Sequence, residues 1–350
     1  MGFKRARVTS LLVTAVVSLG LGAATATAEK LQFMADWIIG AKHAPLFLAR
    51  DKGFWKKEGL EVSISRGYGS GSVAKLQNEG KTDFSFVDTG VIILGRPQGI
   101  RLKQAAVIHA TYPIAWAGLR SNGIHSPKDL AGKVYGGSTG ATSTLMFPLF
   151  ARNAGLDPKQ IKAINLDPTS WTPSFLAKKI DIIGVLTMVT LPVLRYSLKK
   201  KGLDPDKELA VFLGSDYGLD GYANGLTVRD DQIQKDPGLV RRFVRSSMAA
   251  FRRSVTHPDE ALQNFLHKHP ELNREIAAAQ FDKMVESLLA PEARTLALGW
   301  MTEKKMTLTR DMMFEAYTLK AAKMPIGDIY TNEFLEKRPM KKGEIPAKYR

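Results

Sequence analysis

Two short loops carry residue types that suit the recognition of a small ligand. The first, residues 36–43, follows an apolar run at Leu31 and contains Trp37 and His43. An indole offers a flat apolar face to a planar molecule, and an imidazole donates or accepts a hydrogen bond. We therefore take Trp37 and His43 as candidate ligand contacts. The structural alternatives are that Trp37 packs in the interior and that His43 caps the helix that follows.

The second loop, residues 136–143, reads Gly-Gly-Ser-Thr-Gly-Ala-Thr-Ser and opens a predicted helix. Free N–H groups at a helix N-terminus attract anions and carbonyl oxygens, glycine lets a ligand approach the backbone, and hydroxyl groups add donors. The candidate contacts here are Ser138, Thr139, Gly140 and Ala141. A phosphate-binding P-loop is excluded because no Gly-Lys-Ser/Thr follows. A polar turn without a ligand role is the alternative.

Three further candidates lie at or just beyond the ends of predicted strands. Asp88 ends one strand, where its carboxylate either accepts a ligand N–H or caps the next helix. Trp171 follows another strand and either stacks on a ligand or packs in the core. Trp116 likewise either stacks on a ligand or packs in the core. Of the two, Trp171 is the preferred ligand contact because it lies on a loop. Thr187 ends the strand before a long helix.

Catalytic and metal-binding patterns are missing from the sequence. The six histidines show no metal-ligand spacing, no G-x-S-x-G motif occurs, and cysteine is absent. We therefore predict no catalytic residue, no metal site and no cofactor. The absence of cysteine also excludes disulfides and a thiol nucleophile.

Apolar strand-like runs alternate with helix-like stretches over most of the chain. Strands are expected to begin near Leu31, Glu61, Asp83, Leu102, Lys133, Lys162, Asp181 and Glu208. Strands separated by helices imply βαβ units and mainly parallel sheets. Beyond Asp231 the chain is helical, and residues 237–255 form the most amphipathic segment. Two successive α/β blocks predict two lobes, with the late helices packed on the first.

The first 28 residues have the order of a cleavable signal peptide. A basic start at residues 4–7 is followed by apolar residues 11–23 and then by Ala26-Thr27-Ala28, a pattern that signal peptidase accepts. The apolar run is shorter than the roughly 20 residues of a membrane span, which argues against an uncleaved anchor. No cysteine follows, so lipid anchoring of a lipoprotein is excluded. We expect residues 29–350 to be released into the periplasm.

The formal net charge is +16, with Lys and Arg spread along the chain. Such a charge attracts nucleic acid or an anionic ligand, or it belongs to a solvated surface without a specific role. Export argues against nucleic acid, so we expect no nucleic-acid partner.

Three segments resemble the substrate-binding proteins of ABC importers, in the nitrate/taurine (NitT/TauT) and thiamine-pyrimidine-precursor-binding branch. They are residues 36–62, which hold a helix of the form xxAxxKGFFKKEGLDV, residues 80–88, and the DLKGKxVG-like step at 126–137. The resemblance implies an α/β, bilobal type II periplasmic-binding-protein fold, with two parallel or mixed sheets flanked by helices and joined by two crossover strands. Lobe 1 would comprise residues 29–118 and 223–350, and lobe 2 residues 119–222. Tyr222 would lie on the second crossover and face the cleft.

The same resemblance implies a binding protein that captures a small molecule between its lobes. It would deliver this ligand to an ABC permease and ATPase complex at the inner membrane, and we expect a monomer. An exported enzyme and a sensor ectodomain are the alternatives on this fold. The related yeast pyrimidine-precursor synthase uses a cysteine-rich motif that this chain lacks.

The expected ligand is an aromatic or pyrimidine-like compound, or a small anion such as a sulfonate or nitrate. Pyrimidine-precursor binders favour D-W-x-x-N-x-x-H in the first loop, and Gly40 stands at the asparagine position here. They also carry a carboxylate near the position of Thr187, where this chain has none. Two polar contacts of that pattern are therefore missing.

Overall fold

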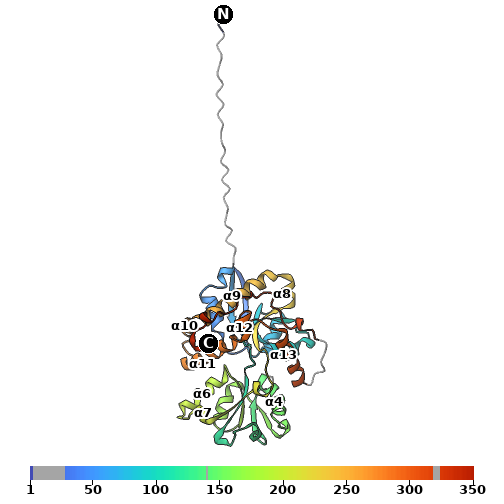
Figure 1. The fold of residues 1–350 in the computed structure, drawn as a ribbon, viewed down its shortest axis with the longest axis vertical. Helices are drawn as coiled ribbons and strands as arrows, with labels where there is room; N and C mark the ends of the chain where they lie inside the picture. Colours follow the sequence, from blue (N-terminus) through green and yellow to red (C-terminus); the bar gives the residue numbers. More distant parts are fainter. Residues whose placement is uncertain (3–27, 139–140, 318–323) are drawn as a thin grey trace.

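The computed structural model describes residues 1–2, 28–138, 141–317 and 324–350. Two five-stranded sheets form the centres of two lobes (Figure 1). Residues 29–107 and 224–350 build the first lobe, and residues 114–213 build the second. Most of the predicted signal peptide, residues 3–27, lies outside the described residues.

The first sheet has the strand order β2-β1-β3-β10-β4. Its strands are β1 (Glu29–Met34), β2 (Leu60–Ser65), β3 (Phe84–Asp88), β4 (Leu102–Val107) and β10 (Asn224–Arg229). β1 runs parallel to β2 and β3, whereas β10 is antiparallel to both of its neighbours. The returning chain thus inserts β10 between two strands that are adjacent in the sequence.

The second sheet repeats this plan in the order β7-β6-β8-β5-β9. Its strands are β5 (Ile114–Leu119), β6 (Val134–Gly137), β7 (Lys162–Asn165), β8 (Ile182–Leu186) and β9 (Leu209–Leu213). β6 is parallel to β7 and β8, and β5 is antiparallel to β8 and β9. The predicted fold class, two mixed sheets flanked by helices, is confirmed.

The chain passes between the sheets twice, at residues 108–113 and 214–223. The sequence places the first lobe boundary at residue 118, but β5 pairs along its whole length with strands of the second sheet. The passage therefore precedes Ile114. All six residues of β5 are buried, which only a central strand with two neighbours and two covered faces allows.

Helices cover both faces of each sheet. They are α1 (Ala44–Asp51), α2 (Ser70–Asn78), α3 (Thr89–Gly95), α4 (Thr142–Asn153), α5 (Trp171–Leu176), α6 (Thr190–Lys200), α7 (Pro205–Glu208), α8 (Asp230–Lys235), α9 (Pro237–Thr256), α10 (Pro258–Lys268), α11 (Arg274–Leu288), α12 (Pro291–Thr295) and α13 (Glu303–Ala316). α4 to α7 belong to the second lobe, and the others pack on the first. At the boundary, α11 contacts α6, and α13 contacts both α3 and α4.

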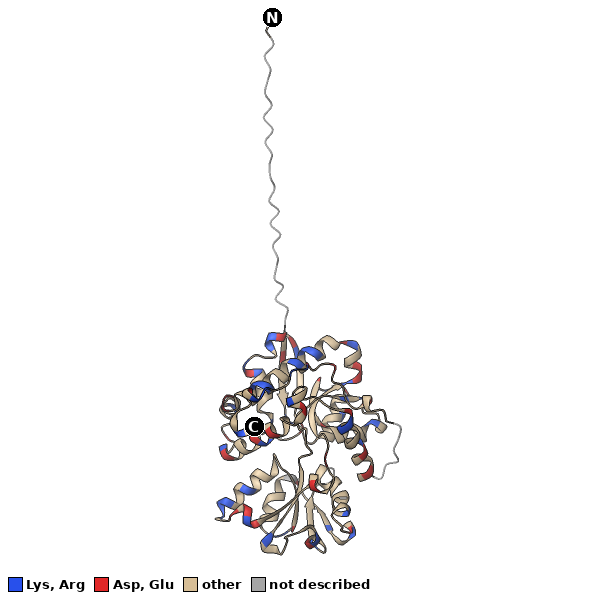
Figure 2. Cartoon of the chain, in the orientation of Figure 1, with Lys and Arg blue, Asp and Glu red and all other residues tan. Residues whose placement is uncertain are grey.

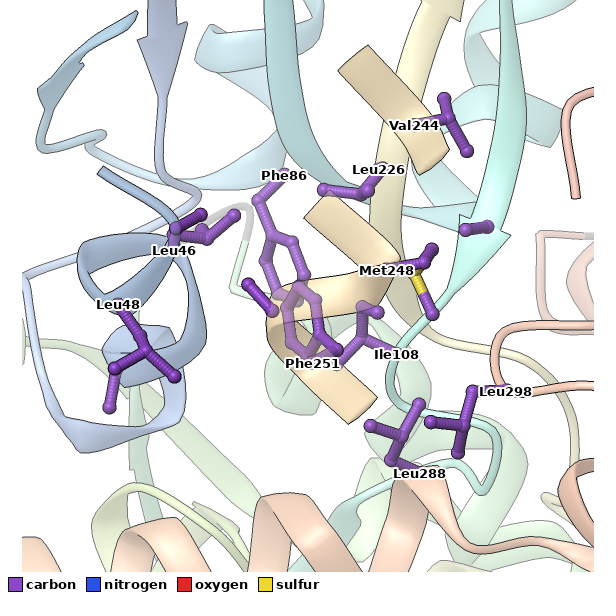
Figure 3. Close-up of a cluster of buried hydrophobic side chains, with 14 of the residues drawn as sticks. Leu46, Leu48, Phe86, Ile108, Leu226, Val244, Met248, Phe251, Leu288 and Leu298 are labelled. Atoms are coloured by element: carbon purple, nitrogen blue, oxygen red, sulfur yellow. The ribbon is translucent and has the colours of Figure 1, made fainter. Parts of the chain in front are cut away.

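α9 is the principal helix of the first core. Asp236 caps its first turn by accepting the N–H of Leu239 at 2.8 Å. Figure 3 shows Phe251 of this helix beside Phe86, whereas Met248 of the same helix points away from Phe86. Each such side chain contributes roughly 1.5–3 kcal/mol by leaving water. The amphipathic pattern of residues 237–255 is therefore used to close the first lobe.

Lys, Arg, Asp and Glu residues are spread over the helices and loops of both lobes (Figure 2). No helix within the described residues is both long and apolar enough to cross a membrane. The described part of the chain also holds no group of three or more acidic or histidine side chains arranged for a metal ion.

Candidate ligand-binding site between the lobes

Two cavities lie where the lobes face each other. The Asp88 cavity has a volume of about 220 Å³ and is lined by α2, α3 and α13 of the first lobe and by Thr142, Leu145 and Met146 of α4. The Trp37 cavity has a volume of about 270 Å³ and lies between residues 37–42 and α11 on one side and Val189 and Val193 on the other. A larger hollow of about 510 Å³ is open to solvent and belongs to the first lobe alone. Of these three hollows, the first two are lined by residues of both lobes.

A buried ion pair occupies the centre of the first loop. Lys42 Nζ lies 2.6 Å from Asp36 Oδ2, and both side chains are less than 10% exposed. Asn224 Nδ2 donates to the same oxygen at 3.1 Å. Burial raises the pKa of Asp36, but the charge of Lys42 and the hydrogen bond from His43 outweigh this effect, so the pKa lies below its ordinary value. Asp36 is therefore an ionised anchor for the loop.

His43 is fully buried and completes this cluster. Its Nε2 lies 2.8 Å from Asp36 Oδ1, and its Nδ1 accepts the N–H of Gly40 at 3.3 Å. Since Nδ1 accepts, Nε2 carries the proton and donates it to the carboxylate. Burial lowers the pKa of His43, which favours this neutral tautomer. The structure thus places the predicted contact inside the loop rather than on a cavity wall.

Trp37 is partly exposed and lines the Trp37 cavity. Beside it, a Cβ atom at Gly40 would lie 3.0 Å from Oε1 of Gln280. That oxygen accepts the N–H of Ala41 at 3.3 Å, while Nε2 of the same side chain donates to the carbonyl of Val189 in the second lobe at 3.2 Å. The amide of Gln280 therefore lies directly against Gly40, and it joins the two lobes.

Asp88 ends β3 and caps α3, since its Oδ1 accepts the N–H of Gly90 at 2.8 Å. It is only 5% exposed and also lines the Asp88 cavity. Burial raises the pKa of Asp88 to about 7. A Cβ atom at Gly90 would come within 2.8 Å of this Oδ1 and 2.7 Å of Met313, so a larger residue here would displace these two side chains. Both predicted roles, capping and facing a cleft, are geometrically available.

Two residues of the first passage between the sheets were not among the predicted contacts. Tyr112 lines the Asp88 cavity, and its buried hydroxyl has no hydrogen-bond partner in the described part of the chain. His109 is buried beside the Asp36 cluster, where burial lowers its pKa to about 3 and keeps the ring neutral. Their position on a lobe-crossing segment is the one sequence signal that marks them.

The second predicted loop lies at the start of α4. Ser138 Oγ donates to the carbonyl of Leu166 at 2.8 Å, and Ala141 is the N-cap of the helix. Thr139 and Gly140 lie outside the described residues. Thr142, the first residue of α4, lines the Asp88 cavity, so the start of this helix reaches the cleft.

Three other predicted contacts lie away from the walls of both cavities. Trp171 is 8% exposed, packs in the second core and donates from Nε1 to Leu166 at 3.1 Å. Tyr222 is fully buried, and its hydroxyl accepts the N–H of Thr302 at 2.9 Å. Thr187 is half-buried, and its N–H donates to the carbonyl of Pro113 at 2.8 Å.

A chain of hydrogen bonds connects the two cavities. The N–H of Asp88 donates to Ser70 Oγ at 3.1 Å, and Asn224 Nδ2 donates both to that hydroxyl at 3.2 Å and to Asp36. Asp36 then pairs with Lys42, which lines the Trp37 cavity. The site therefore consists of two apolar cavities on either side of one buried polar cluster.

Comparison with known proteins places this geometry in a family. The family model described as NMT1/THI5 like matches residues 40–261. The riboflavin-binding protein RibY of Chloroflexus aurantiacus is 25% identical over 88% of this chain and 87% of its own length. The 4-amino-5-hydroxymethyl-2-methylpyrimidine phosphate synthase of Schizosaccharomyces pombe is 23% identical over 73% of this chain and 74% of its own length.

Solved structures agree on the fold. The periplasmic aliphatic sulphonate binding protein SsuA from Escherichia coli superimposes with a TM-score of 0.65 at 16% identity, covering 89% of this chain and 96% of that one. The alkanesulfonate-binding protein SsuA from Xanthomonas axonopodis pv. citri has a TM-score of 0.64 at 12% identity, with 86% and 98% covered. The expected resemblance is confirmed, and the chain belongs to the NMT1/THI5-like family with a periplasmic-binding-protein fold.

Proposed function

We propose that this protein is the periplasmic solute-binding component of an ABC importer. It captures one small molecule in the cleft between its lobes and presents it to a permease and ATPase complex. The observation that carries this proposal is the pair of cavities, each lined by side chains from both lobes. A ligand that contacts both walls binds the closed arrangement more tightly than an open one and so shifts the hinge toward closure.

The comparisons support the proposal at the level of fold and family. SsuA proteins are named as sulfonate-binding proteins, and RibY as a riboflavin-binding protein. The ligand of this chain belongs either to aromatic, pyrimidine-like compounds or to small anions such as sulfonates and nitrate. The basic start of the chain and its apolar run support export to the periplasm.

An enzymatic role is the second candidate, because yeast relatives are named as pyrimidine phosphate synthases. In this chain the buried Asp36, Lys42 and His43 satisfy one another rather than facing a cavity together. Such mutual pairing suits a structural cluster better than an acid–base pair that must reach a substrate. We therefore favour binding without turnover.

A thermal-shift screen of residues 29–350 tests the proposal. The panel comprises 4-aminopyrimidines, riboflavin, taurine and other sulfonates, nitrate, and aromatic carboxylates. A ligand at 100 times its Kd stabilises the folded state by about 2.7 kcal/mol, which raises the Tm by roughly 3–8 °C. Mass spectrometry of the recovered ligand distinguishes binding from turnover. If no member of the panel raises the Tm, the solute-binding function is refuted.

A further inference from the structure

The walls of the Asp88 cavity are apolar, and the polar groups among them are few. Val91, Leu94, Ile100, Met146 and Met313 provide hydrocarbon and thioether surface. Such a lining excludes water and strengthens every electrostatic interaction inside it. The polar side chains of the cavity therefore decide which ligand it accepts.

Two deeply buried polar groups face this cavity. Asp88 and Tyr112 are each 5% exposed, and both lie on its wall. The Tyr112 hydroxyl finds no hydrogen-bond partner among the described residues. An orphaned buried hydroxyl costs roughly 1–3 kcal/mol, and a ligand that bonds to it removes this penalty. The hydroxyl thus indicates a polar ligand atom next to the carboxyl group of Asp88.

The charge of the lining excludes a small anion. Lys75 is the one basic side chain among the described lining residues, and it is exposed on α2 rather than buried with Asp88. An anion beside Asp88 would lose its hydration and meet a like charge or a neutral acid without a buried cation to balance it. A ligand N–H group, by contrast, donates directly to the carboxyl oxygen, and more strongly when the ligand is cationic.

The size of the cavity suits one substituted ring. A protein cavity of about 150 Å³ binds benzene, and this cavity has about 220 Å³. Leu145 and Met146 close it from the second lobe, so that a flat ligand lies between apolar surfaces of both lobes. Flat rings with polar edges fit this combination of apolar faces and two polar groups at one side.

We propose that the Asp88 cavity binds the nitrogen-bearing edge of a planar, neutral or cationic ligand, which donates N–H to Asp88 while Tyr112 bonds to a neighbouring heteroatom. This inference rests on the proposed solute-binding function and selects one of its two ligand classes. Sulfonates and nitrate are rejected by the same site. Tyr112 and Asp88 are the specificity-determining residues.

Matched probes test the selection by charge. Benzamidine and benzoate have nearly the same shape and opposite charge, and 4-amino-5-hydroxymethyl-2-methylpyrimidine and benzenesulfonate extend the comparison. Calorimetric titration of residues 29–350 should show that benzamidine and the aminopyrimidine, which donate N–H, bind at least tenfold tighter than the anions benzoate and benzenesulfonate. Tighter binding of benzoate or benzenesulfonate overturns the inference and leaves the solute-binding function standing. The inference is equally overturned if none of the four probes binds.

Two substitutions test the residues. Tyr112→Phe removes only the hydroxyl and should weaken binding of the N–H donors about 3- to 10-fold while leaving the Tm unchanged or slightly raised, because no protein hydrogen bond is lost. Asp88→Asn keeps an oxygen for the helix cap and should weaken benzamidine binding more than tenfold. Tyr196→Phe, on α6 but outside the walls of both cavities, is the matched control. Unchanged affinity in both cavity variants refutes the assignment even if the probes bind.

Discussion

The buried pair of Lys42 and Asp36 makes a quantitative prediction about stability. Lys42→Met keeps most of the side-chain volume but removes the cation 2.6 Å from Asp36. The carboxylate then remains buried, with only neutral donors from His43 and Asn224. Removing one partner of a buried ion pair costs about 3–5 kcal/mol because the other charge is left uncompensated. We expect Lys42→Met to lower the free energy of unfolding by this amount at pH 7.

A double-mutant cycle isolates the charge effect from packing. Asp36→Asn alone leaves a buried cation, and the double variant Asp36→Asn with Lys42→Met leaves no charge at all. Urea unfolding of residues 29–350 should therefore show the double variant to be more stable than either single variant, with a coupling of roughly 2–4 kcal/mol. Lys199→Met, which breaks an exposed pair with Glu275, should cost less than about 1 kcal/mol.

The pH dependence gives a second measurement of the same pair. The folded-state pKa of Asp36 is depressed, so its stabilising contribution is present above the unfolded pKa of about 3.9 and is lost as the pH falls toward the folded value. The wild-type protein should lose stability below about pH 4 more steeply than the double variant. Single-variant costs below 1 kcal/mol, or additive effects in the cycle, would show that the pair does not hold the loop.

Three further predictions concern the cleft. The pKa of Asp88 is raised to about 7, so the stability from its protonated form is present below about pH 3.9 and is lost as the pH rises through 7. Asp88→Asn should therefore flatten the decline of the unfolding free energy, measured with urea, between pH 4 and 8. An unchanged slope would contradict the raised pKa of Asp88. Gln280→Ala removes the hydrogen bond to Val189, so the ligand-free protein should have a larger radius of gyration in small-angle X-ray scattering than the Gln234→Ala control. Equal radii would show that this hydrogen bond does not hold the two lobes together. Trp37→Ala should weaken at least about tenfold any thermal-shift ligand whose binding Tyr112→Phe leaves unchanged, because such a ligand lies in the Trp37 cavity, whereas Trp300→Ala should not; an unchanged shift would remove Trp37 from the site.

Local elements could be predicted because their signals are short-range. The helix expected to close at Gly80 is α2, which ends at Asn78 and is followed by Gly80 with φ +74°. The turn at Ser126 is capped as its sequence suggests, since Asp129 Oδ2 accepts the N–H of Ser126 at 2.8 Å. Both signals involve residues three or fewer positions apart.

The pairing of strands that are distant in the sequence could not be predicted from such short-range signals. β10 lies between β3 and β4 although more than a hundred residues separate it from both. An alternating apolar pattern indicates that a strand is buried, but it does not specify the neighbour. The first lobe boundary was misplaced for this reason, because β5 has no local feature that assigns it to the second sheet.

The interior of the site depends on even longer separations. Asn224 reaches Asp36 across 188 positions, and Gln280 reaches Ala41 across 239. The motif at residues 36–43 predicts contacts by Trp37 and His43, whereas the structure shows that Lys42 is the charged partner of Asp36. A lysine followed by a histidine is normally expected on the protein surface, and only tertiary packing reveals that both are buried.

The polar cluster explains how the loop at residues 36–43 keeps its shape with glycine at position 40. His43 fixes the backbone at Gly40, Lys42 and Asn224 fix Asp36, and Asn224 also reaches Ser70, which holds the N–H of Asp88. Asn224 begins β10 at the end of the second passage between the sheets, and His109, whose N–H donates to its carbonyl at 2.8 Å, lies on the first. The two passages between the sheets are therefore bonded to each other and to both cavity walls of the first lobe. Under the proposed function, a ligand entering either cavity would meet side chains that are already ordered, so less of its binding free energy would be spent on ordering the first lobe and more would be available to close the second over it.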